Sequence, residues 1–417
     1  MEKIKINNFK DFDYQDATVL LRLDINSPLD PETKRITDDT RIIKSLPTLN
    51  HLLDQGAKVA ILAHQGDTLD YQNLISLEEH AEILNKKANG KVSYIDDCAG
   101  PAAQETVKNL QPGEAVILGN VRYLAEEIST FETVVNLTSE EMTETWLVRN
   151  LAPLFDYYVN DAFSAAHRNC PSMVAFEELL PSAAGELFFK EYSVLSEILE
   201  NPVKPLAFIL GGAKISDAFG MLDQVLSSGT ADYILTSGVT GVVFLLASGV
   251  KVGTKYESWL KERDLLQFVE PAKSYLEKYG DRILVPVDLA YEKDNQRQEI
   301  DVADLPLDEG MFLDIGQKTV DKYGEIIASA GSMFINGPPG VYEDKLFEEG
   351  TKGIWTHIAK SEGYSVVGGG DSVQAAGKFI DLDNIGYVCT AGGAMVRFMT
   401  GKKLPLIEAM EKASQKF

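Results

Sequence analysis

Cysteine is scarce in this chain of 417 residues, which has only Cys98, Cys170 and Cys389. The three lie far apart and form no C-x-x-C pair, so neither a disulfide framework nor a structural zinc site is indicated. This composition fits a reducing compartment, and we expect the protein to be cytoplasmic.

Positive charge is also in short supply, since 39 lysines and arginines stand against 63 aspartates and glutamates, for a formal net charge of -24 at pH 7. Such a balance opposes binding to nucleic acid or to an anionic membrane. The sequence has no long hydrophobic run, and its first 16 residues are too polar for a signal peptide. We therefore expect partners that are small molecules.

The chain does have a succession of short apolar runs that are rich in β-forming residues. Most lack strict alternation, as do strands covered on both faces, and the segments between them often carry helical periodicity, as at 41–56. This pattern predicts an α/β protein with parallel sheets and crossover helices. The runs are TVLLRL (18–23), AKVAILA (57–63), EAVILG (114–119), DYYVN (156–160), PLAFIL (205–210), DYILTS (232–237), RILVPV (282–287), SMFIN (332–336), YSVVG (364–368) and YVCTA (387–391).

The length of the chain usually requires more than one hydrophobic core, so two domains are expected. Residues 183–205 have the pattern of a long helix, which Asn201 and Pro202 end near the middle of the chain. We place a first domain at 1–183, a connecting helix at 184–202 and a second domain at 203–394. The remaining segment, from about 395 to 417, can pack on either domain.

Ligands of open α/β sheets bind beyond the carboxyl ends of the strands, where the first half of this chain has polar and cationic side chains. Taken singly, these residues could be turn formers, core histidines or surface charges. Taken together, the arginines indicate a site for an anionic small molecule, because arginine binds carboxylate or phosphate with two prongs. The residues are Asp24, Asn26, His64, Arg122, His167 and Arg168, with Arg41 at the start of the first long helix.

Glycine dominates the strand ends of the second half, as in GGAK (211–214) and GGGDS (368–372). The bend at 368–372 alone fits a plain strand-to-helix turn as well as a phosphate site, at which a helix N-terminus would favour an anion. Lys214 and Asp371 beside these bends suit the phosphates of a nucleotide and its magnesium ion. The sequence has no complete Walker motif and no GxGxxG bend after the first strand of either half, which argues against a dinucleotide-binding dehydrogenase.

An anion site in one half and a nucleotide site in the other predict phosphoryl transfer with hinge closure of two domains. The motifs that carry these residues resemble the phosphoglycerate kinase family, in its order and over nearly the whole chain, and are most similar to the archaeal branch. They are LRLDINSP (21–28), DDTRI (38–42), NVRYLAEE (120–127), VNDAFSAAHR (159–168), LGGAKISD (210–217), LDIGQKT (313–319), INGPPGVYE (335–343) and VVGGGDS (366–372).

The resemblance implies two Rossmann-like, doubly wound parallel-sheet domains joined by a long helix, with the C-terminal segment returning to the first domain. It also implies a monomeric glycolytic kinase that transfers a phosphoryl group between ATP and the carboxylate of 3-phosphoglycerate. The family's acid-binding residues fall on Asp24, Asn26, Arg41, His64, Arg122 and Arg168, with His167 beside them. Its ATP or ADP site falls on Gly212, Lys214, Asn336, Glu343, Gly369, Gly370, Asp371 and Ser372, with Glu343 on the ribose hydroxyls and Asp371 at Mg²⁺.

The substrate carboxylate is already ionised at neutral pH, so the mechanism requires no general base. Catalysis must come from alignment of the reactants and from neutralisation of the charge on the transferring phosphoryl group. We expect Arg41, Lys214 and the backbone amide at Gly370 to supply that neutralisation.

The chain departs from the family's pattern most clearly at Asp67, where the family has an arginine that helps to hold the distal phosphate of the substrate. Three explanations are open: another basic residue replaces the arginine, Asp67 points away, or the substrate is an acid without that phosphate. Smaller departures are Ala218, in place of a second lysine, and one missing family residue in each of TSGV (236–239), TAGGA (390–394) and ILGN (117–120).

These departures leave two alternatives to the glycolytic kinase. One is a related kinase that forms an acyl phosphate on a different carboxylic acid. The other is a catalytically silent nucleotide-binding relative, against which the retention of Arg41, Lys214, Asp371 and Arg168 argues.

Overall fold

The computed structural model describes residues 6–67 and 72–417 and divides the chain into two compact units. The first unit comprises the chain up to Ser193 together with Lys403–Phe417, and the second comprises Val194–Lys402. The division falls inside α7 (Glu186–Glu200), which ends just before Asn201 and Pro202. The segment that returns to the first unit begins at residue 403, so α15 (Gly392–Met399) belongs to the second unit.

The first unit is built on a sheet of six strands in the order β3-β4-β2-β1-β5-β6, and each neighbouring pair is parallel. Five of the six residues of β1 are buried, because this central strand is covered on both faces. The strands are β1 (Thr18–Leu23), β2 (Lys58–Leu62), β3 (Val92–Tyr94), β4 (Ala115–Ile117), β5 (Tyr157–Asp161) and β6 (Ser182–Ala184).

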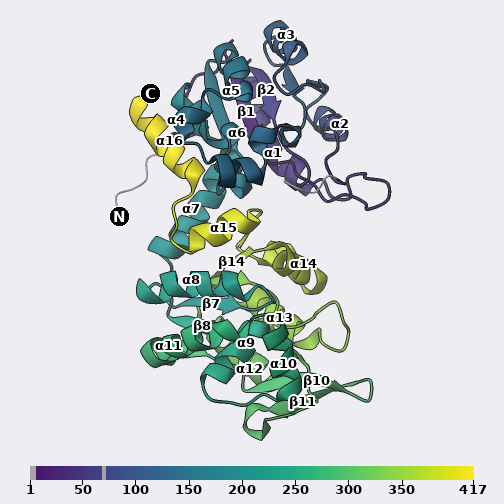
Figure 1. Ribbon diagram of the computed structural model, residues 1–417, viewed down its shortest axis with the longest axis vertical. Coiled ribbons are helices and arrows are strands. Elements are labelled where there is room, and N and C mark those ends of the chain that lie inside the picture. Colours follow the sequence, from purple (N-terminus) through teal and green to yellow (C-terminus); the bar gives the residue numbers. More distant parts are fainter. Residues whose placement is uncertain (1–5, 68–71) are drawn as a thin grey trace. The chain divides into compact units, whose positions relative to one another are not determined.

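Helices connect these strands and cover the sheet. In the first long helix, Ile42, Leu49, Leu52 and Leu53 recur at helical spacing and are buried in the core of the unit. The last helix, yellow in Figure 1, packs against α6 and β6, and its Leu406 N–H donates to the Ala166 carbonyl at 3.2 Å. The helices of this unit are α1 (Thr40–Asp54), α2 (Glu78–Lys87), α3 (Pro101–Asn109), α4 (Ser139–Met142), α5 (Trp146–Leu151), α6 (Pro171–Val174) and α16 (Pro405–Lys416).

The second unit repeats this plan with a six-stranded parallel sheet in the order β15-β14-β13-β7-β8-β9. Its strands are β7 (Leu206–Leu210), β8 (Tyr233–Thr236), β9 (Ile283–Leu284), β13 (Ser332–Asn336), β14 (Tyr364–Gly368) and β15 (Tyr387–Val388). Besides α15, its helices are α8 (Ile215–Ser227), α9 (Gly238–Ala247), α10 (Thr254–Glu262), α11 (Val269–Tyr279), α12 (Gln317–Ser329), α13 (Glu349–Lys360) and α14 (Gly370–Phe379).

A small antiparallel sheet, which the sequence patterns did not predict, is inserted in the second unit. It has the order β11-β10-β12, with β10 (Asp288–Lys293), β11 (Gln296–Asp301) and β12 (Phe312–Ile315). Asp294 and Asn295 form its two-residue turn with φ of 54° and 58°. Positive φ at both positions matches the twist of a tight hairpin.

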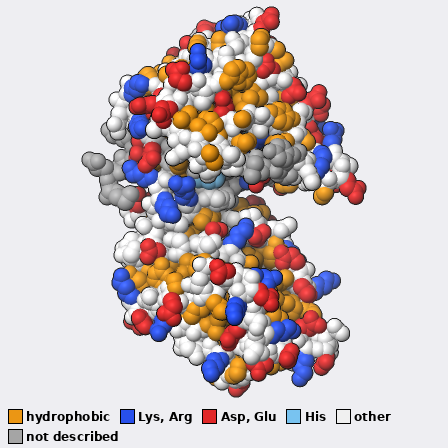
Figure 2. Space-filling view, in the orientation of Figure 1, with side chains coloured by type: hydrophobic (Ala, Val, Ile, Leu, Met, Phe, Trp, Pro, Cys, Tyr) orange, Lys and Arg blue, Asp and Glu red, His pale blue; other side chains and the backbone are white. Residues whose placement is uncertain are grey.

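The doubly wound parallel-sheet fold expected from the sequence is therefore confirmed, and each predicted apolar run contains a strand. Charged side chains of both signs are interspersed over the faces that Figure 2 shows. Among the residues that the structure describes, no helix combines the length and apolar character that crossing a membrane demands.

Candidate functional site

The strand order creates a ligand crevice at the carboxyl edge of the first unit's sheet. The chain leaves β1 toward β2 on one side and leaves β5 toward β6 on the other side. Loops that diverge in this way open a crevice between them. Asp24 directly follows β1, Ser164 lies in the loop after β5, and the Ser164 hydroxyl donates a hydrogen bond to Asp24 Oδ2. Predicted Asp24 therefore meets the loop after β5 through Ser164, which was not predicted as a site residue.

Arg41 is fixed at the crevice by Asp24. Arg41 lies in the first turn of α1, and its Nη1 forms an ion pair with Asp24 Oδ2. The Asp24 side chain is 4% exposed and that of Arg41 is 33% exposed. The carboxylate is thus held inside the protein while part of the guanidinium remains open to solvent, where an anionic ligand can reach it.

His64, which follows β2, lies buried among arginines. Its Nδ1 is 3.0 Å from Nη2 of Arg22 in β1. Burial lowers the pKa of His64 well below its usual range, and the charges of Arg22, Arg122, Arg168 and Arg41 lower it further. The imidazole is therefore neutral at pH 7, and positive charge in this site comes from the guanidinium groups. Arg22 was not predicted as a site residue, because it lies within the buried strand and only residues after the strand ends were considered.

Arg122 and Arg168 converge on one backbone carbonyl. Arg122 Nη1 donates to the Glu127 carbonyl at 2.7 Å, and Arg168 Nη2 donates to the same oxygen at 3.1 Å. The buried Nε of Arg122 has no hydrogen-bond partner among the described residues. Burial, and then the charge of Arg168, lower the pKa of Arg122 to about 10. His167 is half-buried beside Arg168 in the chain. Two adjacent buried guanidiniums favour an anionic ligand.

Amide side chains hold the loops of this crevice together. Gln65 accepts from the Ser27 N–H at 2.9 Å through its side-chain oxygen, and its backbone carbonyl accepts from Asn120 Nδ2 at 2.9 Å. The predicted residue Asn26 accepts from the Gly66 N–H at 3.0 Å, so it secures a bend with φ of 89°. Gln65 and Asn120 were not predicted as site residues, although both stand at strand ends.

The departure at Asp67 lies on a small surface pocket that Asn26, Gly66 and Asn73 also line. Asp67 is exposed. Lys34, whose φ is 58°, reaches the rim of this pocket, where its Nζ donates to Asn73 Oδ1 at 3.1 Å. A lysine therefore contacts one of the residues that line the pocket beside Asp67.

The second unit has a corresponding crevice between β7 and β13, from which the strand order runs outward in both directions. The glycine bends after these strands pack directly on each other. A Cβ on Gly337, whose φ is 86°, would lie 2.2 Å from the Gly211 carbonyl oxygen. Only glycine fits this close approach of two backbones.

These bends line a pocket of about 280 Å³ in the second unit. Its lining includes Gly212, Lys214, Gly369, Gly370, Asp371 and Gly392. Lys214 Nζ lies 3.8 Å from Asp371 Oδ2, and both side chains are largely exposed. An exposed ion pair of this kind contributes little stability, so both groups remain available for a ligand.

Gly370 and Asp371 begin α14, whose N-terminus faces this pocket. Gly369 precedes the helix with a φ of 92°, and a Cβ built on Gly370 would meet no atom within 4 Å. Packing against the described atoms would therefore allow a side chain at position 370. The free N–H groups and the positive end of the helix dipole at such a position suit a phosphate.

Two of the predicted nucleotide-site residues hold the bends in place while also lining the pocket. Asn336 Nδ2 donates to the Gly368 carbonyl at 2.9 Å, and the buried Ser372 hydroxyl accepts from the Gly337 N–H at 2.7 Å. These bonds join the end of β13 and the residue after it to the end of β14 and the first turn of α14. Of the smaller departures, Ala218 is buried in α8, and Gly392 and Gly393 of TAGGA still line the pocket.

A second, more apolar pocket adjoins the first and shares Gly212, Pro338 and Asp371 with it. Glu343 lies on its lining. An aromatic and aliphatic wall beside a phosphate pocket suits a nucleobase. That wall, which sequence reasoning missed, consists of Tyr256, Trp259, Met311, Phe312, Leu313 and Val341.

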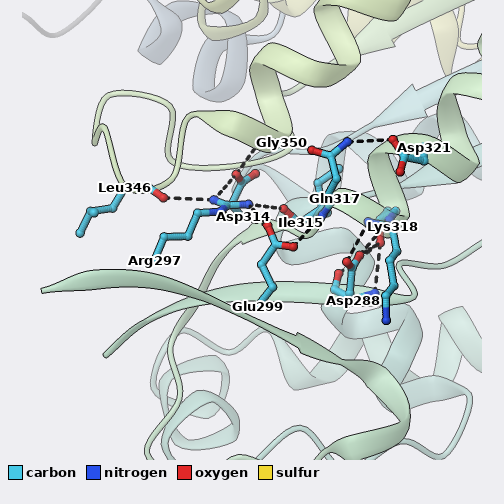
Figure 3. A network of polar contacts seen from close by, with 11 residues as sticks. Asp288, Arg297, Glu299, Asp314, Ile315, Gln317, Lys318, Asp321, Leu346 and Gly350 are labelled. Atoms are coloured by element: carbon cyan, nitrogen blue, oxygen red, sulfur yellow. Dashed lines mark hydrogen bonds and ion pairs between the residues drawn. The ribbon is translucent and has the colours of Figure 1, made fainter. Parts of the chain in front are cut away.

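A partly buried ion pair, drawn in Figure 3, secures β12, the strand that supplies Phe312 and Leu313 to this wall. Arg297 Nη1 donates to Asp314 Oδ2 at 2.8 Å and to the Leu346 carbonyl at 3.1 Å, while Nη2 donates to the Ile315 carbonyl at 2.8 Å. The Gly350 N–H donates to the same Asp314 oxygen at 2.7 Å. Burial raises the pKa of Asp314 to about 7, while Arg297 acts in the opposite direction. The network ties the hairpin to the loop that leads into α13.

No cluster of three or more His, Cys, Asp or Glu side chains suited to a metal occurs in residues 6–67 and 72–417. Mg²⁺ does not need such a cluster when it binds a nucleotide, because one or two carboxylates and the phosphates are sufficient. Asp371, on the lining of the phosphate pocket, fits that requirement.

Two parallel α/β units, one with clustered arginines at its crevice and one with a glycine-bordered pocket at a helix N-terminus, are the features expected of a two-domain phosphotransferase. The Phosphoglycerate kinase family model matches residues 9–402, so the chain belongs to the phosphoglycerate kinase family, and the predicted resemblance is confirmed. The chain is accordingly a kinase.

Archaeal relatives match over almost their whole length. The phosphoglycerate kinase of Methanothermus fervidus is 41% identical over 412 residues, covering 99% of this chain and 98% of the relative. That of Thermococcus kodakarensis is 41% identical over 412 residues, covering 98% and 97%. The crystal structure of phosphoglycerate kinase from Pyrococcus horikoshii OT3 has a TM-score of 0.87 at 37% identity, covering 99% of this chain and 100% of that one.

Proposed function

We propose that the protein transfers a phosphoryl group reversibly between ATP and the carboxylate of 3-phosphoglycerate, with 1,3-bisphosphoglycerate and ADP as the other pair of reactants. The observation that carries this proposal is the arginine-rich surrounding of buried His64, whose Nδ1 lies 3.0 Å from Arg22 Nη2 and whose pKa is lowered by burial and then by the charges of Arg22, Arg122, Arg168 and Arg41. Such a cluster of guanidiniums suits a small molecule with two anionic groups, as 3-phosphoglycerate is.

In the first unit, we assign acid binding to Asp24, Asn26, Arg41, His64, Arg122, His167 and Arg168. The buried Nε of Arg122, which has no partner in the described part of the chain, supports this assignment, since a buried donor without a partner is costly unless a ligand satisfies it. Asp24 and Asn26 act by positioning Arg41 and the Gly66 bend.

In the second unit, we assign the phosphates of ATP to Gly212, Lys214, Gly369, Gly370 and the first turn of α14. Asn336 and Ser372 keep the bends in register, and Glu343 on the apolar pocket binds the ribose hydroxyls. Asp371 would hold Mg²⁺, which when bound neutralises phosphate charge.

The protein's part in the reaction is placement and charge neutralisation. A carboxylate is ionised at neutral pH, so it attacks phosphorus without the help of a base. Arg41 from the acid site and Lys214 with the Gly370 amide from the nucleotide site offset the charge on the transferring group. Because the ligands bind to separate units, we propose that the units close to bring the reactants in line and to exclude water.

A coupled assay with ATP and 3-phosphoglycerate tests this function directly. Turnover that requires both compounds is the expected result, and an absence of turnover at millimolar 3-phosphoglycerate would refute it. The Asp67→Arg variant belongs in the same assay because it restores the family's cation.

One observation favours a second candidate, a kinase that forms an acyl phosphate on a different carboxylic acid. Asp67 places a negative charge beside the pocket where a distal phosphate is expected. If only Asp67→Arg used 3-phosphoglycerate, this second candidate would replace the first. Wild-type activity would instead support Lys34 as the cation that serves the distal phosphate.

A further inference from the structure

Arg168 already holds a carboxylate of its own chain. Its Nε donates to Glu132 Oε1 at 2.5 Å, and its Nη2 donates to the same oxygen. The other oxygen of Glu132 accepts from the Asn169 N–H at 3.3 Å. The two side chains are only 10% and 15% exposed, so solvent screens this ion pair little. Glu132 thus occupies the Nε–Nη2 edge of the guanidinium, to which a ligand carboxylate or phosphate would also bind.

The segment that carries Glu132 is irregular and exposed. Phe131–Val135 form a single turn of π-helix, which ends at Asn136 in the left-handed conformation, and π-helical turns occur frequently at functional sites. Val134 and Val135 are 76% and 50% exposed. Burial of these apolar side chains therefore does little to hold the turn on the unit, and its polar contacts carry more of that role.

Asp24 on Arg41 provides a useful contrast. Asp24 directly follows a buried strand, is 4% exposed and also accepts from Ser164, so it is part of the core of the site. Glu132 lies on a surface turn, and its carboxylate attaches that turn to Arg168. Displacement of Glu132 would leave the strands undisturbed, whereas displacement of Asp24 would not.

We propose that Glu132 is an internal competitor of the acid substrate at Arg168, and that it leaves the guanidinium when the acid binds. This inference rests on the proposed function in assigning Arg168 to the acid. The competitor lowers the apparent affinity for the acid in proportion to the fraction of molecules in which Arg168 is released. It thereby adds selectivity, because an acid binds the Arg168 guanidinium only if its interaction is more favourable than that of the tethered Glu132 carboxylate.

The Glu132→Gln variant tests this proposal, because a neutral amide is a weaker acceptor for arginine than a carboxylate is. We expect the KM for 3-phosphoglycerate to fall by about tenfold, with the KM for ATP and the kcat within twofold of wild type. Glu178→Gln is the matched control. Glu178 accepts from Ser139 close to the same segment and pairs with Lys412 rather than with Arg168, so its loss should leave both KM values unchanged.

A double-mutant cycle with Arg168→Met locates the effect. Glu132→Gln should change nothing further in an Arg168→Met background. If it still lowered the KM there, the effect would be one of general charge and the proposal would be overturned. An unchanged or raised KM for Glu132→Gln alone would also overturn it, a raised value meaning that Glu132 orients Arg168 for the substrate.

Calorimetric titration with inorganic sulfate separates this inference from the proposed function, since it needs no turnover. Tighter sulfate binding to Glu132→Gln than to wild type, by about tenfold, supports internal competition even if 3-phosphoglycerate proves not to be the substrate. Equal sulfate affinities of the variant and the wild type would refute internal competition by Glu132. The proposed function would still be tested separately by the kinase assay. Thermal unfolding of each variant confirms that folded proteins are compared.

Discussion

Replacement of Gly370 by alanine separates ligand binding from folding at the glycine-rich bend. A Cβ at Gly370 meets no atom of the described residues within 4 Å, and the residue does not have a positive φ. Alanine should therefore fit without strain, and its higher helix propensity should stabilise α14 by about 0.5 to 1 kcal/mol. If the glycine were there only for the turn, the Gly370→Ala variant would be indistinguishable from wild type in nucleotide binding.

A phosphate held by the first turn of α14 changes that expectation. The added methyl group would occupy the space through which the phosphate approaches the backbone, weakening at least one charge-assisted hydrogen bond. We expect a loss of about 2 kcal/mol, or roughly thirtyfold in the Kd for ATP. Calorimetric titration with ATP gives the Kd, and thermal unfolding gives the stability of the same sample.

Two further glycines supply the controls. Gly377 lies later in α14, where a Cβ would make an ordinary contact at 3.9 Å with Leu382, so Gly377→Ala should stabilise the helix without a change in ATP affinity. Gly337→Ala should lose both stability and ATP affinity, because its Cβ would come 2.2 Å from the Gly211 carbonyl oxygen at a φ of 86°. Wild-type ATP affinity in Gly370→Ala would refute the assignment of this bend to a phosphate.

Three other perturbations test the remaining parts of the structure. Arg41→Ala should lower kcat by several hundredfold, about 3 to 4 kcal/mol, with little change in the KM for ATP, and a normal kcat would remove Arg41 from the transition state. Burial lowers the pKa of His80 to about 4, so the folded state should lose about 3 kcal/mol as the pH falls from 6.5 to 4. Chemical denaturation across that range should show a smaller decrease in the free energy of unfolding with falling pH in His80→Gln than in wild type. Identical pH dependence would mean that His80 is not the group whose protonation destabilises the fold. Arg297→Met leaves buried Asp314 without its cation, so it should destabilise the second unit by about 3 kcal/mol and raise the KM for ATP, whereas wild-type values for both would show that the pair is dispensable.

The parallel sheets could be predicted from the sequence because their strands are covered on both faces. Residues 206–210 of β7, for example, are buried without exception, and such a strand is a continuous apolar run. The hairpin of β10 and β11 has no such signal, since every residue of β11 is exposed or partly exposed. Its turn residues, Asp294 and Asn295, were the available clue, because both types tolerate positive φ.

The predicted site residues that the structure places at the two crevices mostly stand directly after a strand. Asp24, His64 and Gly212 were found by that rule, and the switch points of the two sheets explain why the strand ends converge. The rule does not reach Arg22, which lies within a strand, or Trp259, which comes from a helix remote in sequence. Glu132 could not be predicted either, because a π-helical turn has no sequence pattern that places its carboxylate on an arginine.

The electrostatics of the first unit explain why a tethered acid would be useful there. Burial, and then the charge of Arg168, lower the pKa of Arg122, so these buried guanidiniums need anions nearby. Asp24 is bound by Ser164, and Glu127 accepts from both the N–H and the hydroxyl of Ser172 at 2.6 Å, so neither can make way for a ligand without disrupting the core. Glu132 is attached to an exposed turn and can make way. It would compensate Arg168 while the site is empty and give up that position to the acid, so the same arginine stays paired in both states.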